Sequence, residues 1–447
     1  MLYQLHEMRR AFMHPVSAWA NSASQLYTNP YSPLSYSPMA RRIAAALDLT
    51  HRLGKDYEKP PWRIHAVETL GGTAVVEPEI VLDKPFCKLL HFKKRHRVKS
   101  TDPGPKVLIV APLSGHHATL LRDTVRTMLA EHDVYVTDWV DARMVPLTDG
   151  DFGLDEYVYY VQDFIRFLSP DLHLISVCQP TVPVLAAVSL MASNQDPAKP
   201  LTMTMMGGPI DTRVGVTQVN DLAKSHNMQW FERNVIHTVP QRYPGYLRKV
   251  YPGFLQYAGF VSMNPGRHAN SHWDYFEHLV QGDEQSAEAH RDFYDEYNAV
   301  LDLPAEFYLD TIRVVFQDHQ LPEGRWKVGG QLVCPQDITE TALMTVEGEF
   351  DDISGVGQTS AAHDLCSSIP KSAKSHYLVK GAGHYGIFSG KRWRNVVAPQ
   401  IAAFIAKHGD HKPPAAKGRA KAVTKPSRTS DASSASAAST TKTRKAA

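Results

Sequence analysis

Residues 173–188 decide the fold, and they read His-Leu-Ile-Ser-Val-Cys-Gln-Pro-Thr-Val-Pro-Val-Leu-Ala-Ala-Val. An apolar strand stops at Cys178, and an alanine-rich helix begins directly behind it. This order is typical of a nucleophile elbow, a strained strand-to-helix turn that lifts one reactive side chain above a parallel sheet. A cysteine at the tip of the turn predicts acyl transfer through a thioester.

Cys178 has two interpretations. A lone cysteine is most often a small buried apolar residue. The reactive alternative needs the thiolate, which the N-terminus of a helix and a nearby imidazole would both favour. Pro183 stands in the first turn of the expected helix, where a missing N–H is tolerated. A cysteine at a strand end before a helix start is rarer than a core cysteine, so its position favours the nucleophile.

An acid and a base follow Cys178 in the order that an elbow nucleophile requires. The acidic segment 347–353 comes after an apolar strand, and Asp351 is the expected acid, with Asp352 as the next candidate. His384 lies in a glycine-rich loop after the next strand and is the expected base. An acidic loop or a single histidine is weak evidence alone, but their joint order supports a Cys178–Asp351–His384 triad.

An oxyanion hole needs two backbone donors. One is expected from Gln179, directly after the nucleophile, and the other from Ser114 or Gly115 in the loop after the strand at 106–112. The neighbouring His116 has two open interpretations, a substrate contact or a polar residue at a helix start.

Strands and helices alternate along most of the chain. The expected strands are 106–112, 133–139, 173–177, 201–206, 341–346 and 376–379. Apolar residues at helical spacing lie between several of them, which predicts an α/β fold with a doubly wound, mostly parallel sheet. We expect this core in two parts, 76–209 and 336–408.

The segment 210–335 interrupts this rhythm and is rich in aromatic residues and proline. An insertion at this place would form a cap over the site. Trp230 and Phe231 are candidates for substrate contact, and burial in the core of the cap is the commoner explanation for such side chains.

The two ends of the chain differ from its middle. Residues 1–75 are expected to form a helical and loop segment packed on the body, since Met8, Phe12, Val16 and Trp19 recur at helical spacing. Contact of this face with an external apolar surface is the alternative. Residues 409–447 have little to bury and are expected to be disordered. From Lys407 onward there are ten Lys/Arg against two Asp, an excess of +8 in a chain of net charge +2.

Composition and missing motifs argue against several classes of protein. No apolar run approaches the roughly 20 residues of a membrane span, and the N-terminus has no apolar signal-peptide core, so a cytoplasmic protein is expected. The four cysteines form no Cys-x-x-Cys pair, and the motifs of phosphate loops, dinucleotide folds and zinc peptidases are missing. No metal site and no bound cofactor are expected.

Seven stretches resemble the intracellular polyhydroxyalkanoate (polyhydroxybutyrate) depolymerases, which are cysteine-dependent α/β-hydrolases related to the polyester synthases. They run in order over residues 1 to about 408, at positions 1–7, 53–60, 110–116, 175–180, 302–308, 348–359 and 383–388. The resemblance implies an α/β-hydrolase fold, the triad Cys178, Asp351 and His384, and a polymer of 3-hydroxybutyrate as substrate. It also implies a location at the surface of storage granules.

Two residues depart from the general elbow pattern, which has glycine two positions either side of the nucleophile. This chain has Ser176 and Pro180 there. The depolymerases are similar in this respect, whereas the synthases more often keep Gly-x-Cys-x-Gly. The resemblance therefore favours degradation over synthesis, with water or the thiol of coenzyme A (CoA) as the acyl acceptor.

Two alternatives stay open at this stage. One is a polyhydroxyalkanoate synthase using the same thioester. The other is a tethering protein with a vestigial hydrolase domain that contacts granule-associated proteins, and whose basic tail binds nucleic acid through phosphate charge. A solvated tail without a partner explains the same composition.

Overall fold

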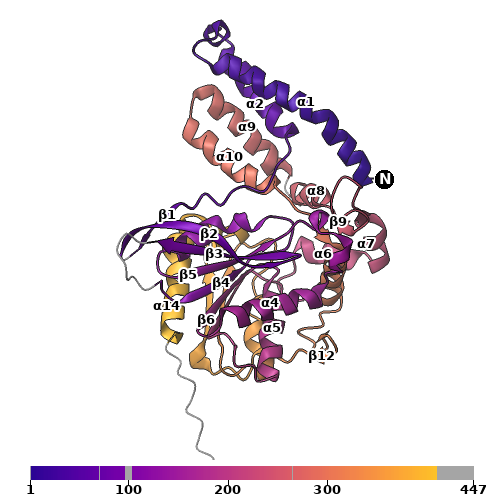
Figure 1. Cartoon of the computed structure of the whole chain (residues 1–447), viewed down its shortest axis with the longest axis vertical. Coiled ribbons are helices and arrows are strands. Elements are labelled where there is room, and N and C mark those ends of the chain that lie inside the picture. Colours follow the sequence, from indigo (N-terminus) through magenta and orange to yellow (C-terminus); the bar gives the residue numbers. More distant parts are fainter. Residues whose placement is uncertain (1, 70, 96–102, 264, 410–447) are drawn as a thin grey trace, which may run out of the picture. The chain divides into compact units, whose positions relative to one another are not determined.

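A nine-stranded sheet forms the centre of the part of the chain that the computed structural model describes, residues 2–69, 71–95, 103–263 and 265–409. Its strands follow the order β1-β2-β3-β5-β4-β6-β7-β13-β14 (Figure 1). Their bounds are β1 (Ala66–Thr69), β2 (Gly72–Lys84), β3 (Cys87–Arg95), β4 (Lys106–Val110), β5 (Asp133–Trp139), β6 (Leu172–Val177), β7 (Thr202–Met206), β13 (Ala342–Gly348) and β14 (Lys374–Val379).

The strands from β5 to β14 in this order are parallel. Val177 at the end of β6 lies opposite Met206 of β7, and Gly348 of β13 lies opposite Val379 of β14. The carboxyl ends of these strands therefore meet at one edge of the sheet, where ligands of such folds bind. All six residues of β6 are buried, as expected for a parallel strand covered on both faces. The predicted α/β-hydrolase class, with its mostly parallel sheet, is confirmed.

Helices cover both faces of the sheet. On one face, α4 (Leu154–Leu168) packs against α5 (Thr181–Ser193). On the other face, α3 (Arg122–Met128) contacts α14 (Ala398–His408), and Figure 1 shows α14 on the opposite side of the strands from α4 and α5. Two short helices, α12 (Ala362–Leu365) and α13 (Gly390–Arg392), lie in the C-terminal part.

The sheet begins earlier than the sequence predicted. We expected residues 1–75 to be helical or loop, but β1 and the start of β2 lie in that range. The strands β1, β2 and β3 are antiparallel, and part of β2 faces water, with Val75 and Ile80 about half exposed. A partly exposed antiparallel strand of this kind mixes polar and apolar residues, so it lacks the continuous apolar run by which the buried strands were found.

The connection from β7 to β13 contains the segment that was expected to be the cap. Its helices are α6 (Gln218–Ser225), α7 (Met228–Asn234), α8 (Gly253–Met263), α9 (Pro265–Gln281), α10 (Glu284–Asn298) and α11 (Ala305–Thr311). Its short strands are β8 (His237–Thr238), β9 (Lys249–Tyr251), β10 (Leu303–Pro304), β11 (Lys327–Val328) and β12 (Gln331–Leu332).

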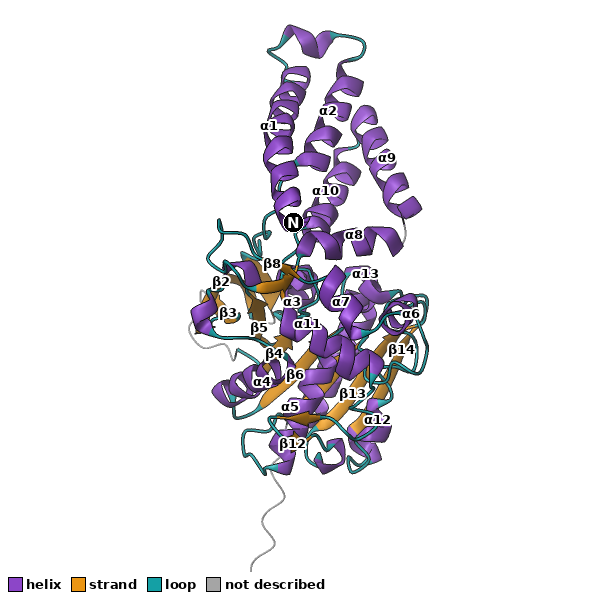
Figure 2. Ribbon diagram, turned by 90° about the vertical axis from the view of Figure 1, so that its right-hand side faces the viewer, coloured by secondary structure: helices purple, strands orange, loops and turns teal. Residues whose placement is uncertain are grey.

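Two N-terminal helices, α1 (Leu2–Thr28) and α2 (Ala40–Gly54), pack along each other. The helix α2 contacts α9, and α9 contacts α10, so the four form the bundle that Figure 2 shows. No helix of the described ranges is both long and apolar enough to cross a membrane. Of the expected tail, 410–447 lies outside the described residues.

The predicted packing face of α1 is wrong. The four residues that recur at helical spacing, Met8, Phe12, Val16 and Trp19, are all exposed. The residues that α1 buries are small or polar instead, namely Tyr3, Glu7, Ser17, Ala20 and Ser24. Small side chains let two helix backbones approach closely, which explains why this face rather than the apolar one meets α2.

Candidate active site

Cys178 occupies the turn between β6 and α5. Its φ angle is +68°, a left-handed conformation that costs a residue with a Cβ about 1–3 kcal/mol. The N–H of Cys178 donates to the carbonyl oxygen of Met206 at 2.7 Å, which ties the turn to the end of β7. Cys178 is partly exposed and forms no disulfide. A strained residue between a parallel strand and a helix has the geometry of a nucleophile elbow.

The first turn of α5 packs tightly against the chain that follows β7. Thr181 opens α5 and is fully buried. A Cβ added to Gly208 would lie 1.8 Å from the Oγ1 of Thr181, so only glycine fits at that position. This close approach fixes where α5 starts and therefore where the turn of Cys178 stands.

Asp351 and His384 form a buried pair at the same edge of the sheet. Nδ1 of His384 lies 2.8 Å from Oδ2 of Asp351, and both side chains are almost fully buried. The other carboxylate oxygen, Oδ1, accepts the N–H groups of Ile353 at 2.9 Å and Ser354 at 2.8 Å. Asp352, the second candidate for the acid, is exposed. The structure therefore places Asp351 at the imidazole.

His384 interacts with the cysteine as well as with the acid. Burial by itself lowers the pKa of His384. The charges of Cys178 and Asp351, and hydrogen bonds to both side chains, outweigh burial and raise that pKa well above its ordinary value. Because Nδ1 is bonded to Asp351, Nε2 is the ring atom that faces the thiol. The three residues predicted as a triad are thus brought together.

Glu347 holds the loop that carries Asp351, a role that the sequence analysis missed. Its buried carboxylate at the end of β13 accepts N–H groups from Gly357, Thr359 and Ser360 at 2.8 to 3.1 Å. Thr359 also joins this loop to Gly208, whose N–H donates to the Thr359 hydroxyl at 2.8 Å. A carboxylate at a strand end was the available signal, but its partners lie 10 or more residues away.

Gly207 is a second residue that the sequence did not reveal. It follows β7 with a φ of +55°. A Cβ at this position would lie 2.7 Å from Cδ1 of Ile387, 3.2 Å from Cε1 of His384 and 3.3 Å from Oδ2 of Asp351. The backbone of Gly207 therefore forms a wall beside the His384–Asp351 pair.

The loop expected to supply the second oxyanion donor is held by the cap. Gly115 has a φ of +109°, and its carbonyl oxygen accepts the N–H of Leu301 at 2.8 Å. A Cβ on Gly115 would lie 2.5 Å from Oε1 of Gln256 in α8, so glycine is required here. Ser114 is half-buried in the same turn. The amide donors of Ser114 and Gly115 thus belong to a fixed loop.

The side chain of Gln179 is buried next to the nucleophile without a protein partner. Gln179 is 8% exposed, and neither Oε1 nor Nε2 makes a hydrogen bond to another described residue. An amide buried in this way costs free energy unless some other group bonds to it. From the sequence, only the backbone N–H of Gln179 was expected to take part in catalysis.

The three residues proposed for substrate contact lie in different surroundings. His116 is buried, stacks on Phe260 at 4.9 Å and lies 3.2 Å from the carbonyl oxygen of Tyr297, and burial lowers its pKa to about 4. Phe231 is fully buried in the cap, where it packs with the half-buried Trp230 at 5.2 Å. This packing fits side chains that support the cap.

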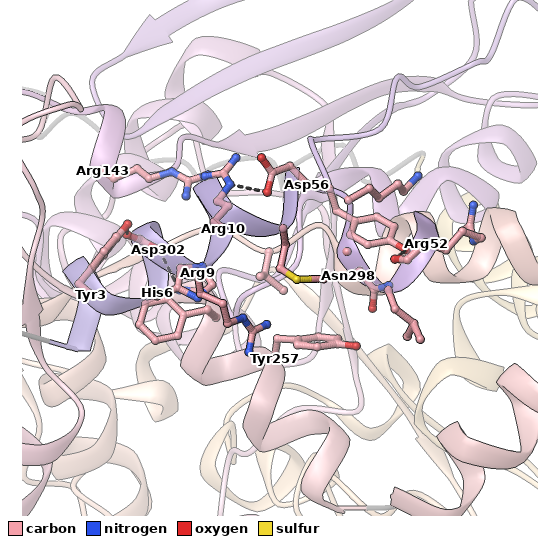
Figure 3. Close-up of a pocket in the computed structure, with 18 residues that line it drawn as sticks. Tyr3, His6, Arg9, Arg10, Arg52, Asp56, Arg143, Tyr257, Asn298 and Asp302 are labelled. Atoms are coloured by element: carbon pink, nitrogen blue, oxygen red, sulfur yellow. Dashed lines mark hydrogen bonds and ion pairs between the residues drawn. The ribbon is translucent and has the colours of Figure 1, made fainter. Parts of the chain in front are cut away.

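A cavity of about 430 Å³ lies away from these groups (Figure 3). It is bounded by the first half of α1, the end of α2 and α8, and no residue of the predicted triad lines it. Figure 3 shows Arg10 bonded to Asp56 on one side and Tyr3 beside Asp302 on the other. Paired charges therefore occupy much of its wall, and it is not the site of the chemistry described above.

Part of the chain matches a family of known proteins. Residues 207–409 match the family model described as "PHB de-polymerase C-terminus", which confirms the resemblance found in the sequence over that range. A search of curated proteins finds no match.

Several solved structures are similar to the chain at low identity. A putative lipase of Acinetobacter baumannii has 10% identity and a TM-score of 0.39, covering 74% of this chain and 93% of its own. A monoacylglycerol lipase of Paleococcus ferrophilus has 13% identity and a TM-score of 0.37, covering 68% and 96%. A thermophilic esterase of Thermogutta terrifontis has 13% identity and a TM-score of 0.37, covering 77% and 98%.

Proposed function

We propose that this chain degrades poly(3-hydroxybutyrate), or a similar short-chain polyhydroxyalkanoate, at the surface of storage granules through a cysteinyl thioester, because residues 207–409 match the family model of the PHB depolymerase C-terminus. At the coarser level the chain is a carboxylic ester hydrolase, an ester-hydrolysing depolymerase. The observation that carries the proposal is Cys178 in a strained elbow beside the buried His384–Asp351 pair.

The first half of the reaction transfers an acyl group to the cysteine. His384 takes the thiol proton at Nε2, and the thiolate of Cys178 attacks an ester carbonyl carbon of the polymer. The carbon–oxygen bond of the ester then breaks, and His384 returns the proton to the departing oxygen, which becomes a hydroxyl chain end. Asp351 keeps the imidazole in the correct tautomer through its bond to Nδ1.

The second half releases the acyl group. Water gives a proton to His384 and attacks the thioester carbonyl, and the carbon–sulfur bond breaks to leave a free carboxylic acid and the thiol of Cys178. Coenzyme A can replace water, because exchange between two thioesters is nearly balanced in energy; the product is then a 3-hydroxyacyl thioester of CoA. No resident cofactor takes part in either route.

Donors around Cys178 would hold the substrate. We assign the developing oxyanion to backbone N–H groups of Gln179 and of Ser114 or Gly115. We also assign the side-chain amide of Gln179 to an ester oxygen of the polymer, because such a bond would satisfy a polar group that has no partner among the described residues.

The proposal is tested by trapping the acyl-enzyme on amorphous poly(3-hydroxybutyrate) particles, with an acid quench and measurement of the intact protein mass. Wild type should gain one or more hydroxybutyryl units that neutral hydroxylamine removes, as it does for a thioester. Cys334→Ala is the matched control, since Cys334 is also a free, partly exposed thiol. It should still form the adduct, and Cys178→Ala should not.

The soluble products identify the acceptor. Free 3-hydroxybutyrate or its short oligomers indicate water, whereas 3-hydroxybutyryl-CoA that forms only in the presence of CoA indicates thiolysis. An adduct on Cys178→Ala, or one that resists hydroxylamine, would contradict the thioester. Polymer and free CoA formed from 3-hydroxybutyryl-CoA would assign the chain to the synthases instead.

A further inference from the structure

The helix α1 exposes its large apolar side chains along one stripe. These side chains, here called the α1 stripe, are between 37% and 73% exposed and are Leu2, Leu5, Met8, Phe12, Val16, Trp19 and Leu26. Their spacings are three, three, four, four, three and seven residues, which places them on one face of a helix. A surface helix of a folded protein normally turns this face inward.

The opposite face of α1 is fixed to the rest of the chain. The hydroxyl of Tyr3 donates to Asp302 at 2.6 Å (Figure 3), and Glu7 accepts a bond from Arg242 at 2.6 Å. Further along the helix, Ser24 donates to the carbonyl oxygen of Ala44 in α2 at 3.0 Å. Turning the α1 stripe inward would break these contacts and bury charge, so the stripe is held outward by the fold.

The connection between α1 and α2 continues the exposed apolar surface. Four large side chains are exposed there, with Tyr31 at 93% and Tyr36 at 77%, accompanied by Leu34 and Met39. Tyrosine and tryptophan combine an apolar ring with a polar edge, and they are favoured where an apolar phase meets water. An exposed apolar surface of this extent marks an interaction site.

Within α1, α2 and their connection, the exposed charged side chains are all positive. Between residues 2 and 54, the exposed charged side chains are Arg9, Arg41 and Arg42. The two acids of this region are not available, because Glu7 is buried against Arg242 and Asp48 is half-buried and bonded to Tyr275. Apolar residues flanked by arginine fit an apolar surface that carries negative charge.

A polyester particle under hydrolysis presents such a surface. Its bulk is apolar and insoluble in water. Each ester that is hydrolysed leaves a carboxylic acid at one new chain end, and this acid is ionised at neutral pH because its ordinary pKa lies near 4. The surface therefore gains negative charge as degradation proceeds.

The base of the same bundle reaches the candidate active site. A ring nitrogen of His116 lies 3.2 Å from the carbonyl oxygen of Tyr297 at the end of α10, and the N–H of Leu301, just after α10, donates to Gly115 in the loop assigned to the oxyanion hole. The helix α10 belongs to the bundle that α1 and α2 complete. A particle held by α1 is thus held by a structure that extends to the reacting groups.

We propose that the α1 stripe, with the exposed residues of the α1–α2 connection, is the surface by which this protein adsorbs to its polyester particle. The inference rests on the proposed function, since it names the polymer as the occupant of this face. Adsorption raises the local concentration of ester bonds at the active site without contributing to the chemical step.

The test compares Phe12→Ser/Trp19→Ser in the full chain with a matched control, Phe167→Ser/Leu147→Ser, which removes two similarly exposed apolar side chains elsewhere. Three quantities are measured: co-sedimentation with lipid-free amorphous poly(3-hydroxybutyrate) particles, turnover of those particles, and hydrolysis of a soluble 3-hydroxybutyrate trimer. The stripe variant should lose retention and particle turnover by about tenfold or more and keep trimer hydrolysis. The control should match wild type in all three.

A second variant tests the charge. Arg41→Gln/Arg42→Gln should weaken retention on partly hydrolysed particles more than on fresh ones, and high salt should remove the difference because it screens exposed charges. An equal loss of retention relative to wild type on fresh and on partly hydrolysed particles would contradict the role of the carboxylate ends.

The outcomes separate this inference from the function on which it rests. If wild type hydrolyses neither particles nor trimer, the proposed function fails. If it hydrolyses both, and Phe12→Ser/Trp19→Ser is retained on particles like wild type, the α1 stripe is not the adsorption surface. A wild-type dimer that becomes a monomer in this variant with unchanged retention would assign the stripe to a second copy. Retention on anionic phospholipid vesicles and not on lipid-free polymer would assign it to lipid.

Discussion

Two helices of this chain treat apolar residues in opposite ways. In α5, eleven of the 13 residues are buried, including every large aliphatic side chain. In α1, five of the 27 residues are buried, and these are small or polar while the large apolar ones face outward. The apolar side chains of α5 have their partners within the fold. Those of α1 stay exposed within the part of the chain that the structure describes, which fits a partner outside the fold.

The difference in burial between α5 and α1 corresponds to two functions, support of the nucleophile and adsorption to the substrate. The burial of α5 on all sides gives the elbow of Cys178 a rigid support, which a reacting group needs because small displacements are costly in rate. The exposure of α1 gives the molecule an adhesive surface that plays no part in the chemistry. Changes near α5 should therefore affect turnover of every substrate, and changes on the α1 stripe should affect the insoluble substrate alone.

The largest effect is expected from Cys178→Ala. Loss of the nucleophile should lower turnover of both polymer particles and soluble trimer by at least about 10⁴-fold. Retention on particles should stay unchanged, because the α1 stripe is untouched. Product release and co-sedimentation measure the two properties, and circular dichroism checks the fold. Activity above a thousandth of wild type would remove Cys178 from the mechanism.

Asp351→Asn should follow, with a loss of about 10²–10⁴-fold in turnover of either substrate. The amide can no longer accept from Nδ1 of His384 as a carboxylate does, so the imidazole loses both its orientation and a charge that raises its pKa. Asp352→Asn is the control, since Asp352 is the exposed neighbour in the same loop. Equal losses in the two variants would contradict the assignment of the acid.

The same pair sets a pH dependence of stability. The pKa of His384 is raised in the folded protein, so the native state binds its proton more tightly than the unfolded state does. This contribution is fully present below about pH 6.5, the ordinary pKa of histidine, and is lost as pH rises through the folded-state pKa. Wild type should therefore lose more unfolding free energy than Asp351→Asn over that range, as measured by urea denaturation at several pH values.

The next largest effect is the expected difference in unfolding free energy between a substitution in α5 and one in α1. Leu185→Ala in α5 should lower the unfolding free energy by about 2–5 kcal/mol, because Leu185 is fully buried in the main core. Leu5→Ala in α1 should change it by no more than about 0.5 kcal/mol, because Leu5 is mostly exposed. Urea denaturation of both variants tests this, and a similar loss in both would mean that the α1 stripe is packed in solution.

The sequence predicted those parts of the fold that have a local pattern. Strand β6, Cys178 and helix α5 follow one another directly, so their apolar runs were sufficient to predict the elbow. The antiparallel strands β1 to β3 at one end of the sheet were missed because polar and apolar residues mix in them, and part of β2 faces water. For α1, the periodicity correctly predicted which apolar residues share a face, but the prediction that this face packs on the body was wrong. Helical spacing shows which residues share a face, and only the three-dimensional structure shows whether another element covers that face.

The residues of the candidate site likewise fall into those that the sequence could predict and those that it could not. Asp351 and His384 could be found because parallel strands end at one edge, so residues after successive strands come together. The buried carboxylate of Glu347 and the backbone of Gly207 could not be found in this way. Their roles depend on groups that lie 10 to about 180 residues away along the chain, in contacts that no local pattern records.

The smallest effect is expected at Gly207, and it tests how tightly the elbow side of the molecule is built. In Gly207→Ala the new methyl group can displace the end of Ile387, but not His384 without lengthening its 2.8 Å bond to Asp351. Turnover of the soluble trimer should fall about 10- to 100-fold. Gly150→Ala separates crowding from backbone strain, since Gly150 also has a positive φ, +81°, but has open space around its Cβ position. It should keep full turnover at a similar cost in stability. If both variants keep full turnover, the wall beside His384 tolerates a methyl group, and the contrast between a tightly packed active site and an open α1 surface is weaker than the structure indicates.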